Sequence, residues 1–369
     1  MSVRPFVQSD IPQVADLYWT FMRGREGKSP SQVQSFFQEL YFTENPCIDS
    51  TFPSFVYQGK NRDIVGFLGG VVRKMSACGQ SIRVALGGNF VVHPGGRGEL
   101  PAMRLLGALM EGNQDLSLTD SANNISRLLL ERVGWSTIVP FSIHWVRVLR
   151  PAQYAVFNLS RVTAPSTSAA LTFAATPFCE VLDRVTANVR FNPFRLAEPL
   201  MHGEELTVET LLHCIGEFRN GYSIWAQYDI HGLEWLLSFM QRMPGRGDLR
   251  KVVVRNDDRK ILGWYVYYAK SGAVGEVVQI GGAPRYTRHI LDHLFRDAWN
   301  HGVIALHGVA NTQLLPDFSA KNCLFTCRGG WALAHSKHPE LLELLNRGDA
   351  FLSRLDTEWC LDPGGRLAE

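Results

Sequence analysis

The sequence has no cysteine pair with redox or metal spacing, no long apolar run and no excess of either charge. Its seven cysteines are scattered and form no C-x-x-C motif, which we interpret as reduced thiols in a reducing compartment. The longest apolar run, 261–269, is about half the length that a membrane-spanning helix needs. The N-terminal residues lack the apolar core of a signal peptide. These absences predict a cytoplasmic protein with no membrane partner and no bound metal.

The charges are almost balanced, with 37 Lys and Arg against 35 Asp and Glu and a net charge of +2. Such a balance does not favour binding to nucleic acid, which attracts strongly basic domains. The 46% of hydrophobic and 20% of charged residues are typical of globular proteins. A chain of 369 residues then predicts two domains.

The order of the predicted elements is the same in both halves of the chain: strand, hairpin, strand, glycine break, helix, strand and helix. This order predicts an internal structural repeat. We expect an N-terminal domain at 1–150, a connector rich in Ala, Thr, Ser and Pro at 151–205, and a C-terminal domain at 206–369. The predicted fold class is α/β of the α+β type, with a mixed, mostly antiparallel sheet flanked by helices in each domain.

A glycine-rich turn at 93–98 follows the predicted strand 82–92 and precedes a predicted helix. The first turn of a helix leaves backbone N–H groups unpaired, and the helix dipole favours negative charge there. Glycines also let a ligand approach the backbone closely. The turn is therefore a candidate anion site, although a glycine-rich connection before a helix is more often a tight turn without a ligand.

The first half, about 2–150, resembles the GNAT superfamily of acyl-CoA N-acyltransferases. Arg97-Gly98 matches the family's Arg-Gly loop, Ala102 matches its last position, and Leu100 replaces the middle glycine. Asn123 precedes Gly134 by eleven residues, the spacing of a later family motif. The second half lacks the Arg-Gly loop and has a degenerate cofactor loop. The double arrangement is similar to that of N-myristoyltransferases and of Fem-type aminoacyl-tRNA-dependent transferases.

The resemblance implies transfer of an acyl group, which we expect to be acetyl, from a CoA thioester to an amine. The acceptor would be a small molecule or a peptide, and acyl-CoA would be the co-substrate. A splayed strand would face the thioester, and the glycine-rich loop would bind the pyrophosphate. The expected cofactor-binding residues are Val91, Val92, Arg97, Gly98, Glu99, Ala102 and Asn123.

Three polar residues are candidates for catalysis. Asp120 ends a predicted strand beside the expected cleft and is a candidate general base or, alternatively, the cap of the next helix. His307 lies on the comparable strand of the second half and is a candidate base or a structural histidine. Asn89 would position substrate or satisfy a strand bulge. The family's general-acid tyrosine is replaced by Leu130, so the thiolate leaves unaided or another residue supplies the proton.

Two other functions are compatible with this sequence. The double fold also suits an aminoacyl-tRNA-dependent transferase of the Fem type, but the chain has no cluster of Lys and Arg for tRNA. Leu100 and Leu130 suit a degenerate protein that senses a ligand or scaffolds a partner. The oligomeric state stays open.

Overall fold

The computed structural model describes residues 2–21, 30–43, 45–46, 51–95, 100–162, 178–189, 192–219, 221–327 and 330–362. The chain forms two compact units. The first comprises 1–142, 219–245 and 327–369, and the second comprises 143–218 and 246–326. Each unit is thus assembled from separate stretches of sequence.

A sheet of nine strands forms the centre of the first unit among the described residues. Its main path runs in the order β1 (Ser2–Pro5), β2 (Phe55–Gln58), β3 (Ile64–Ala77), β4 (Gln80–Val92), β5 (Leu116–Ala122), β15 (Trp331–Ser336) and β6 (Ser136–Thr137). The short strands β9 (Ile224–Ala226) and β16 (Ala350–Phe351) pair with each other, and β9 also pairs with β3. The pairing of β4 with β5 is parallel, whereas all other pairs along the main path are antiparallel.

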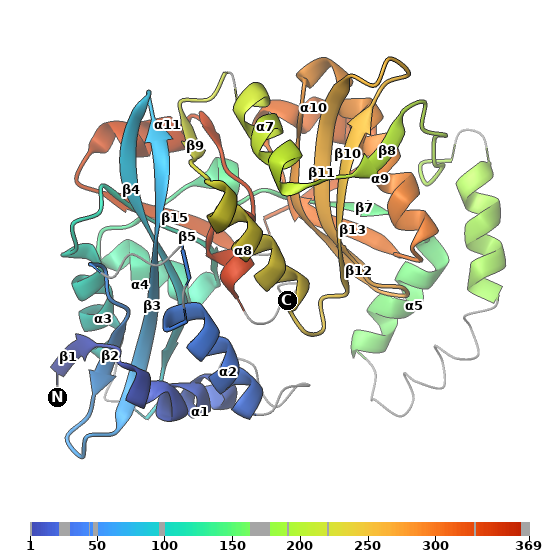
Figure 1. Ribbon diagram of the computed structural model, residues 1–369. Helices are drawn as coiled ribbons and strands as arrows, with labels where there is room; N and C mark the ends of the chain where they lie inside the picture. The colour runs from blue at the N-terminus through green and yellow to red at the C-terminus, as the bar shows by residue number, and fades with distance from the viewer. Residues whose placement is uncertain are drawn as a thin grey trace. The chain divides into compact units, whose positions relative to one another are not determined.

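Helices cover both faces of this first sheet because its side chains alternate between the faces. Phe67 of β3 packs with α1 (Ile11–Phe21) and α2 (Pro30–Tyr41), and the next residue, Leu68, packs with α3 (Leu100–Met110) on the opposite face. The unit also contains α4 (Asn124–Arg132), α8 (Ile230–Gln241), α11 (Pro339–Asn346) and the 3₁₀ helix η5 (Glu358–Leu361) (Figure 1).

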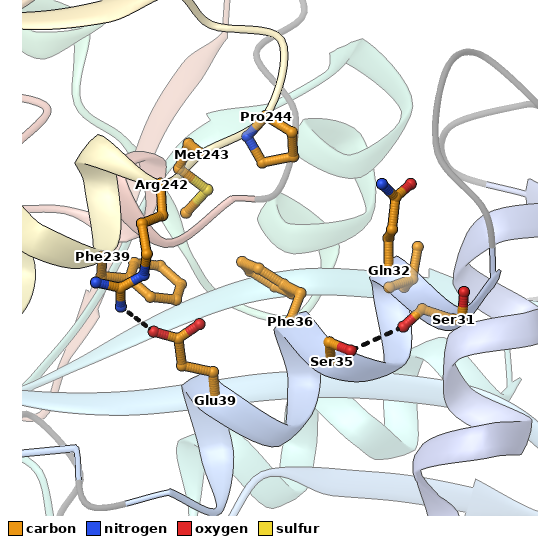
Figure 2. Close-up of a pocket in the computed structure, with 10 residues that line it drawn as sticks. Ser31, Gln32, Ser35, Phe36, Glu39, Phe239, Arg242, Met243 and Pro244 are labelled. Atoms are coloured by element: carbon orange, nitrogen blue, oxygen red, sulfur yellow. Dashed lines mark hydrogen bonds and ion pairs between the residues drawn. The ribbon is translucent and has the colours of Figure 1, made fainter.

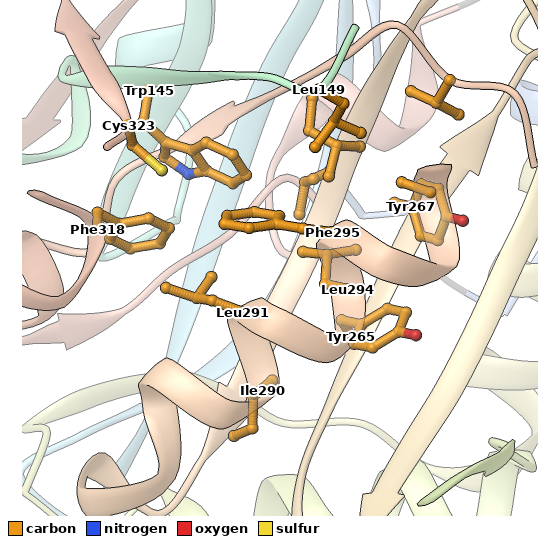
Figure 3. Packing of buried hydrophobic residues seen from close by; sticks show 14 of the residues in the cluster. Trp145, Leu149, Tyr265, Tyr267, Ile290, Leu291, Leu294, Phe295, Phe318 and Cys323 are labelled. Carbon is orange, nitrogen blue, oxygen red and sulfur yellow. The ribbon is translucent and has the colours of Figure 1, made fainter. Parts of the chain in front are cut away.

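The second unit has a seven-stranded sheet. Its order is β8 (His202–Glu205), β10 (Asp248–Arg255), β11 (Ile261–Ala269), β12 (Val274–Gly282), β13 (Ala305–Val309), β7 (His144–Val148) and β14 (Leu324–Thr326). The helix α9 (Thr287–Asn300) supplies the centre of its core. Figure 3 shows Leu291 and Phe295 of α9 near Trp145 and Phe318, whose ring centroids are 5.0 Å apart. Further helices are α5 (Pro151–Val162), α7 (Val208–Phe218) and α10 (Leu315–Ala320).

The two sheets follow one plan, which confirms the predicted structural repeat. The main path of each has one parallel pair, β4 with β5 and β12 with β13, flanked by antiparallel strands. In each sheet the sixth strand, counted from β1 or β8, comes from the other half of the sequence. Figure 1 shows this exchange by colour: red β15 lies among blue and teal strands, and green β7 lies among orange ones.

The exchange divides the chain differently from the expected boundaries. The predicted domain 1–150 includes β7, which belongs to the second sheet, and the predicted domain 206–369 includes β15, which belongs to the first. The expected connector, 151–205, contains α5, helical residues 178–188 and β8. Strand pairing depends on residues far apart in sequence, so local patterns placed the strands without identifying their partners.

Candidate functional site

The parallel strands β4 and β5 separate in the middle of the first sheet. Residues 84–86 of β4 pair with residues 116–118 of β5, and the two strands do not pair beyond these positions. Each strand has an irregularity just after that point. The register of β4 against β3 shifts at Asn89, and the register of β5 against β15 shifts at Asp120. Such bulges redirect side chains and N–H groups, and they are common beside active sites.

Asn89 occupies the bulge of β4 with a positive φ of 52°, a conformation that asparagine tolerates better than most residues. Its Nδ2 donates to the hydroxyl of Tyr41, at 3.0 Å. Burial raises the pKa of Tyr41, which therefore stays neutral. The buried Oδ1 of Asn89 has no hydrogen-bond partner among the described residues. Asn89 thus satisfies the bulge, one of its two predicted roles, and its role toward substrate stays a prediction.

Glu358, the first residue of η5, fills the space where β4 and β5 part. Its Oε1 accepts hydrogen bonds from the backbone N–H groups of Asp120, at 2.7 Å, and Ser121, at 3.2 Å. The bulge explains why two consecutive N–H groups reach one acceptor. The hydroxyls of Ser121 and Thr119 also donate to this oxygen. Gly88 leaves room for the side chain, because a Cβ there would lie 3.1 Å from Cβ and Cγ of Glu358.

Asp120, which is partly buried, and Glu358, which is buried, form a pair of carboxyl groups. Asp120 Oδ2 accepts from the Thr357 hydroxyl at 2.6 Å, and the backbone N–H of Asp120 is the donor that links it to the Glu358 carboxyl. Burial raises the pKa of Asp120, against the opposing effects of Thr357, Glu358 and Arg354. Burial and then the charge of Asp120 raise the pKa of Glu358 well above its ordinary value. Two close carboxyl groups in such surroundings titrate as a pair.

A second buried network holds the segment 353–361, which carries Glu358. Arg73 of β3 donates to the Tyr228 hydroxyl at 2.6 Å and to the Leu355 carbonyl oxygen at 2.9 Å. The Tyr228 hydroxyl lies 2.7 Å from Asp356 Oδ1, to which it donates, and Ser353 donates to Asp356 Oδ2. The network fastens the segment to the sheet at the positions just before Glu358.

The structure places the other predicted catalytic residue in the second unit. His307 lies on β13 and is buried, with its ring stacked on that of His144 at a centroid distance of 5.2 Å and an angle of 9°. Asp120 and Asn89 belong to the first unit. Stacking inside a sheet fits the structural alternative for His307.

Several expected cofactor-binding residues have defined structural surroundings. Asn123 caps α4, where its side chain accepts from the Ser126 N–H at 2.8 Å. The alternative that Asp120 caps this helix is therefore wrong. Val91 is buried among α1 and α2, Val92 is partly buried, and Ala102 is buried in the first turn of α3. Arg97, Gly98 and Glu99 lie outside the described residues. Leu130 is buried against the sheet.

Sequence analysis missed Glu358, Thr357 and Arg354. The stretch 347–358 has charged residues between apolar ones, as in the helix end and turn that we expected there. The charged side chains at 354, 356 and 358 are buried in the structure, and the alternation with apolar residues carries no signal of this burial.

A hollow of about 390 Å³ lies between α2 and the end of α8, within the first unit. Figure 2 shows Phe36 and Phe239 lining it, with ring centroids 5.6 Å apart, and Met243 beside them. An ion pair between Glu39 and Arg242 lies at its edge. Its size and its apolar walls with a few polar groups are those of small-molecule sites.

Neither a metal site nor a membrane helix is found in the part of the chain that the structure describes. No group of His, Cys, Asp or Glu side chains there has an arrangement that would hold a metal ion. No helix there is both long and apolar enough to cross a bilayer.

No family model and no curated protein matches the sequence. Solved structures do match. A probable N-acyltransferase of Enterococcus faecalis has a TM-score of 0.54 at 12% identity, over 91% of this chain and 72% of its own. Saccharomyces cerevisiae N-myristoyltransferase with bound myristoyl-CoA has a TM-score of 0.55 at 10% identity, and the match covers 90% of this chain and 77% of its own. A GCN5-related N-acetyltransferase of Anabaena variabilis has a TM-score of 0.55 at 12% identity, and the match covers 92% of this chain and 73% of its own. The chain therefore has the fold shared by GNAT-type N-acyltransferases and N-myristoyltransferase.

Proposed function

We propose that the protein is an N-acyltransferase that moves an acyl group from a CoA thioester to an amine. The observation that carries this proposal is the Asp120–Glu358 carboxyl pair at the point where the bulged strands β4 and β5 part. An attacking amine must lose a proton, and a buried carboxylate with a raised pKa is suited to take it at neutral pH.

The proposal of acyl-CoA as donor has support from the fold and from polar atoms at the site. The yeast N-myristoyltransferase of the same fold was solved with bound myristoyl-CoA. The buried Oδ1 of Asn89 would accept an N–H of the donor, since no described residue satisfies it. We propose Arg97 and Gly98 as the pyrophosphate-binding residues and acetyl as the first acyl group to test.

The chain's own contribution to the reaction would be to hold the reactants and manage protons. A thioester and an amine held together react as if within one molecule, which accounts for much of the rate enhancement in such enzymes. The Thr357 hydroxyl would keep the Asp120 carboxyl oriented while it accepts the amine proton. Free CoA and an amide would be the products.

The donor part of the proposal is tested by changing the glycine-rich loop. We expect Arg97→Glu to weaken acetyl-CoA binding by about tenfold or more, because a carboxylate would replace a charge-assisted bond to phosphate. Isothermal titration calorimetry with acetyl-CoA and longer acyl-CoAs measures this, with Arg347→Glu on an exposed part of the first unit as the control. If no acyl-CoA binds to the wild type, the donor is not CoA; if Arg97→Glu binds acyl-CoA normally, Arg97 does not bind the pyrophosphate.

We propose that the hollow between α2 and α8 receives the apolar part of the amine acceptor. Tyr41 belongs to α2 and bonds Asn89, and α8 contacts η5, so both walls adjoin elements of the site. Phe36→Ala should then raise the KM for the acceptor about tenfold and change kcat little, since removing a pocket wall weakens binding of substrate and transition state alike. Steady-state kinetics measure this, with Phe325→Ala as an exposed aromatic control. An equal effect of both variants on KM would exclude the hollow.

One observation favours a second candidate, a ligand-binding protein without turnover. Glu358 already occupies the N–H groups of Asp120 and Ser121 in the gap between the strands. In that case acyl-CoA would bind, but amines would release no free thiol from it. A thiol-release assay over a panel of amines separates this candidate from the enzyme.

A further inference from the structure

The carboxyl pair of Asp120 and Glu358 has the oxygens to hold a proton, and a catalytic role for that proton rests on the proposed function. We propose that Asp120 and Glu358 share one proton at neutral pH and deliver it to the departing thiolate, so that the pair acts as both general base and general acid. Nothing in the family resemblance assigns a role to Glu358, which reaches the site from a segment 238 residues from Asp120.

The hydrogen bonds around the pair show where the proton belongs. Glu358 Oε1 accepts four hydrogen bonds, and Asp120 Oδ2 accepts one from Thr357. The other two oxygens, Asp120 Oδ1 and Glu358 Oε2, are buried with no donor among the described residues. A buried carboxylate oxygen without a donor is costly, and a proton shared by two such groups removes that cost.

The charges buried around the segment 353–361 give independent support. Two buried guanidinium groups, Arg73 and Arg354, accompany three carboxyl groups, those of buried Asp356 and Glu358 and that of partly buried Asp120. Five ionised groups would leave one excess negative charge in a low-dielectric interior. One retained proton makes the set neutral, and we place it on the Asp120–Glu358 pair, which holds the two carboxylate oxygens without a donor.

The surroundings of the pair contain few other groups that could titrate. From β5 the pair meets the hydroxyls of Thr119 and Ser121, and from β4 it meets Gly88. Its own segment contributes Thr357 and the charge of Arg354. The segment also carries the buried carboxyl of Asp356, whose pKa burial raises, whereas arginine stays charged throughout. Comparison of the wild type with Glu358→Gln therefore isolates the changes in protonation that belong to the pair.

The proposed step balances in atoms and charge. The amine nitrogen attacks the thioester carbon, the C–N bond forms, and the amine proton passes to the ionised carboxylate of the pair. The C–S bond then breaks, and the proton already held by the pair passes to the thiolate sulfur. The pair ends with one proton, as it began. Leu130 cannot donate at the position where the resemblance implies a tyrosine, and in this proposal the carboxyl pair takes that role.

A first experiment tests the shared proton without any acyl transfer. The folded state binds the proton more tightly than the unfolded chain does, so the pair stabilises the fold at low pH. That stabilisation is lost as the pH rises from the ordinary carboxyl pKa of the unfolded chain through the raised pKa values of the pair in the folded state. We expect the unfolding free energy to fall more with rising pH in the wild type than in Glu358→Gln. Infrared difference spectra of the wild type should also show a protonated carboxyl at neutral pH. Equal pH slopes and no such band would overturn the shared proton.

A second experiment tests delivery to the thiolate. In the wild type, kcat should fall at high pH as the pair loses its proton, since both protonation states are needed. Glu358→Gln should lower kcat at neutral pH by about 10- to 100-fold and should remove the fall of kcat at high pH. The control Asp183→Asn changes a buried carboxyl in the second unit, and it should leave both kcat and its pH dependence as in the wild type. Full activity of Glu358→Gln with an unchanged profile would overturn the role as acid. Absence of turnover in the wild type would instead overturn the proposed function.

Discussion

Asp120→Asn is expected to lower kcat by about 10²- to 10⁴-fold, the range that general acid–base groups contribute. The amide keeps the size of the side chain and can still accept from the Thr357 hydroxyl, which lies 2.6 Å from Oδ2. It cannot take a proton from the amine. Because it also removes the partner of Glu358, the remaining carboxyl loses both the repulsion and the shared proton. Steady-state thiol release with saturating acyl-CoA measures the change.

Two controls make the result specific to chemistry. Binding of acyl-CoA to Asp120→Asn should stay within about twofold of the wild type, because the variant changes proton transfer and leaves the donor contacts intact. Asp183→Asn replaces another buried carboxyl, which accepts from the Ala152 N–H at 2.7 Å in the second unit. We expect it to retain kcat. A loss of kcat in Asp120→Asn no greater than in Asp183→Asn would remove Asp120 from the reaction.

Local sequence patterns predicted most of the helices and strands of this fold because those patterns are local. The spacing of apolar residues predicts helices at 31–41 and 288–300 and a strand at 261–269, and α2, α9 and β11 lie within a residue of these bounds. The same patterns predict a helix at 123–132, whereas Asn123 caps α4 and precedes its first residue. These features depend on neighbours within one or two turns.

The exchange of β7 and β15 could not be predicted in the same way. Both strands are short, and each reads as an ordinary buried strand of its own half. The strands with which β7 and β15 pair depend on which strands of each sheet are left unpaired, and this is a property of the assembled units. An internal repeat was visible in the order of elements, but that order does not reveal which sheet receives the sixth strand.

The candidate site was predicted on one side only. Asp120 follows the end of a predicted strand, and Asn89 follows two glycines inside another. Both residues could therefore be identified as candidates from the sequence. From the sequence, Gly88 predicts a bulge in the strand, whereas in the structure it also provides space for the side chain of Glu358. The carboxyl that completes the pair comes from a distant segment with no motif of its own. A pair formed across such a separation is a product of tertiary structure, and its chemistry follows only once the fold is known.

The largest effect on stability is expected for Arg73→Met. The variant removes the guanidinium that bonds Tyr228 and the Leu355 carbonyl oxygen and that accompanies the buried carboxyl of Asp356. Asp356 is 1% exposed, so its charge would be left in the interior without compensation. Removing one partner of a buried charged network costs about 3–5 kcal/mol of unfolding free energy. Chemical denaturation measures the loss in the first unit.

The same change should loosen the segment that carries Glu358. Hydrogen exchange at 353–361 is expected to speed up more than exchange in β3, because the segment loses its attachment while the sheet keeps its ladder. Arg347→Met breaks an exposed pair with Glu343 and should cost about 0.3–0.5 kcal/mol. Adding Asp356→Asn to Arg73→Met should restore part of the stability, since it removes the uncompensated charge. If Arg73→Met costs no more than Arg347→Met, the segment is held by its apolar contacts, and the placement of Glu358 does not depend on this network.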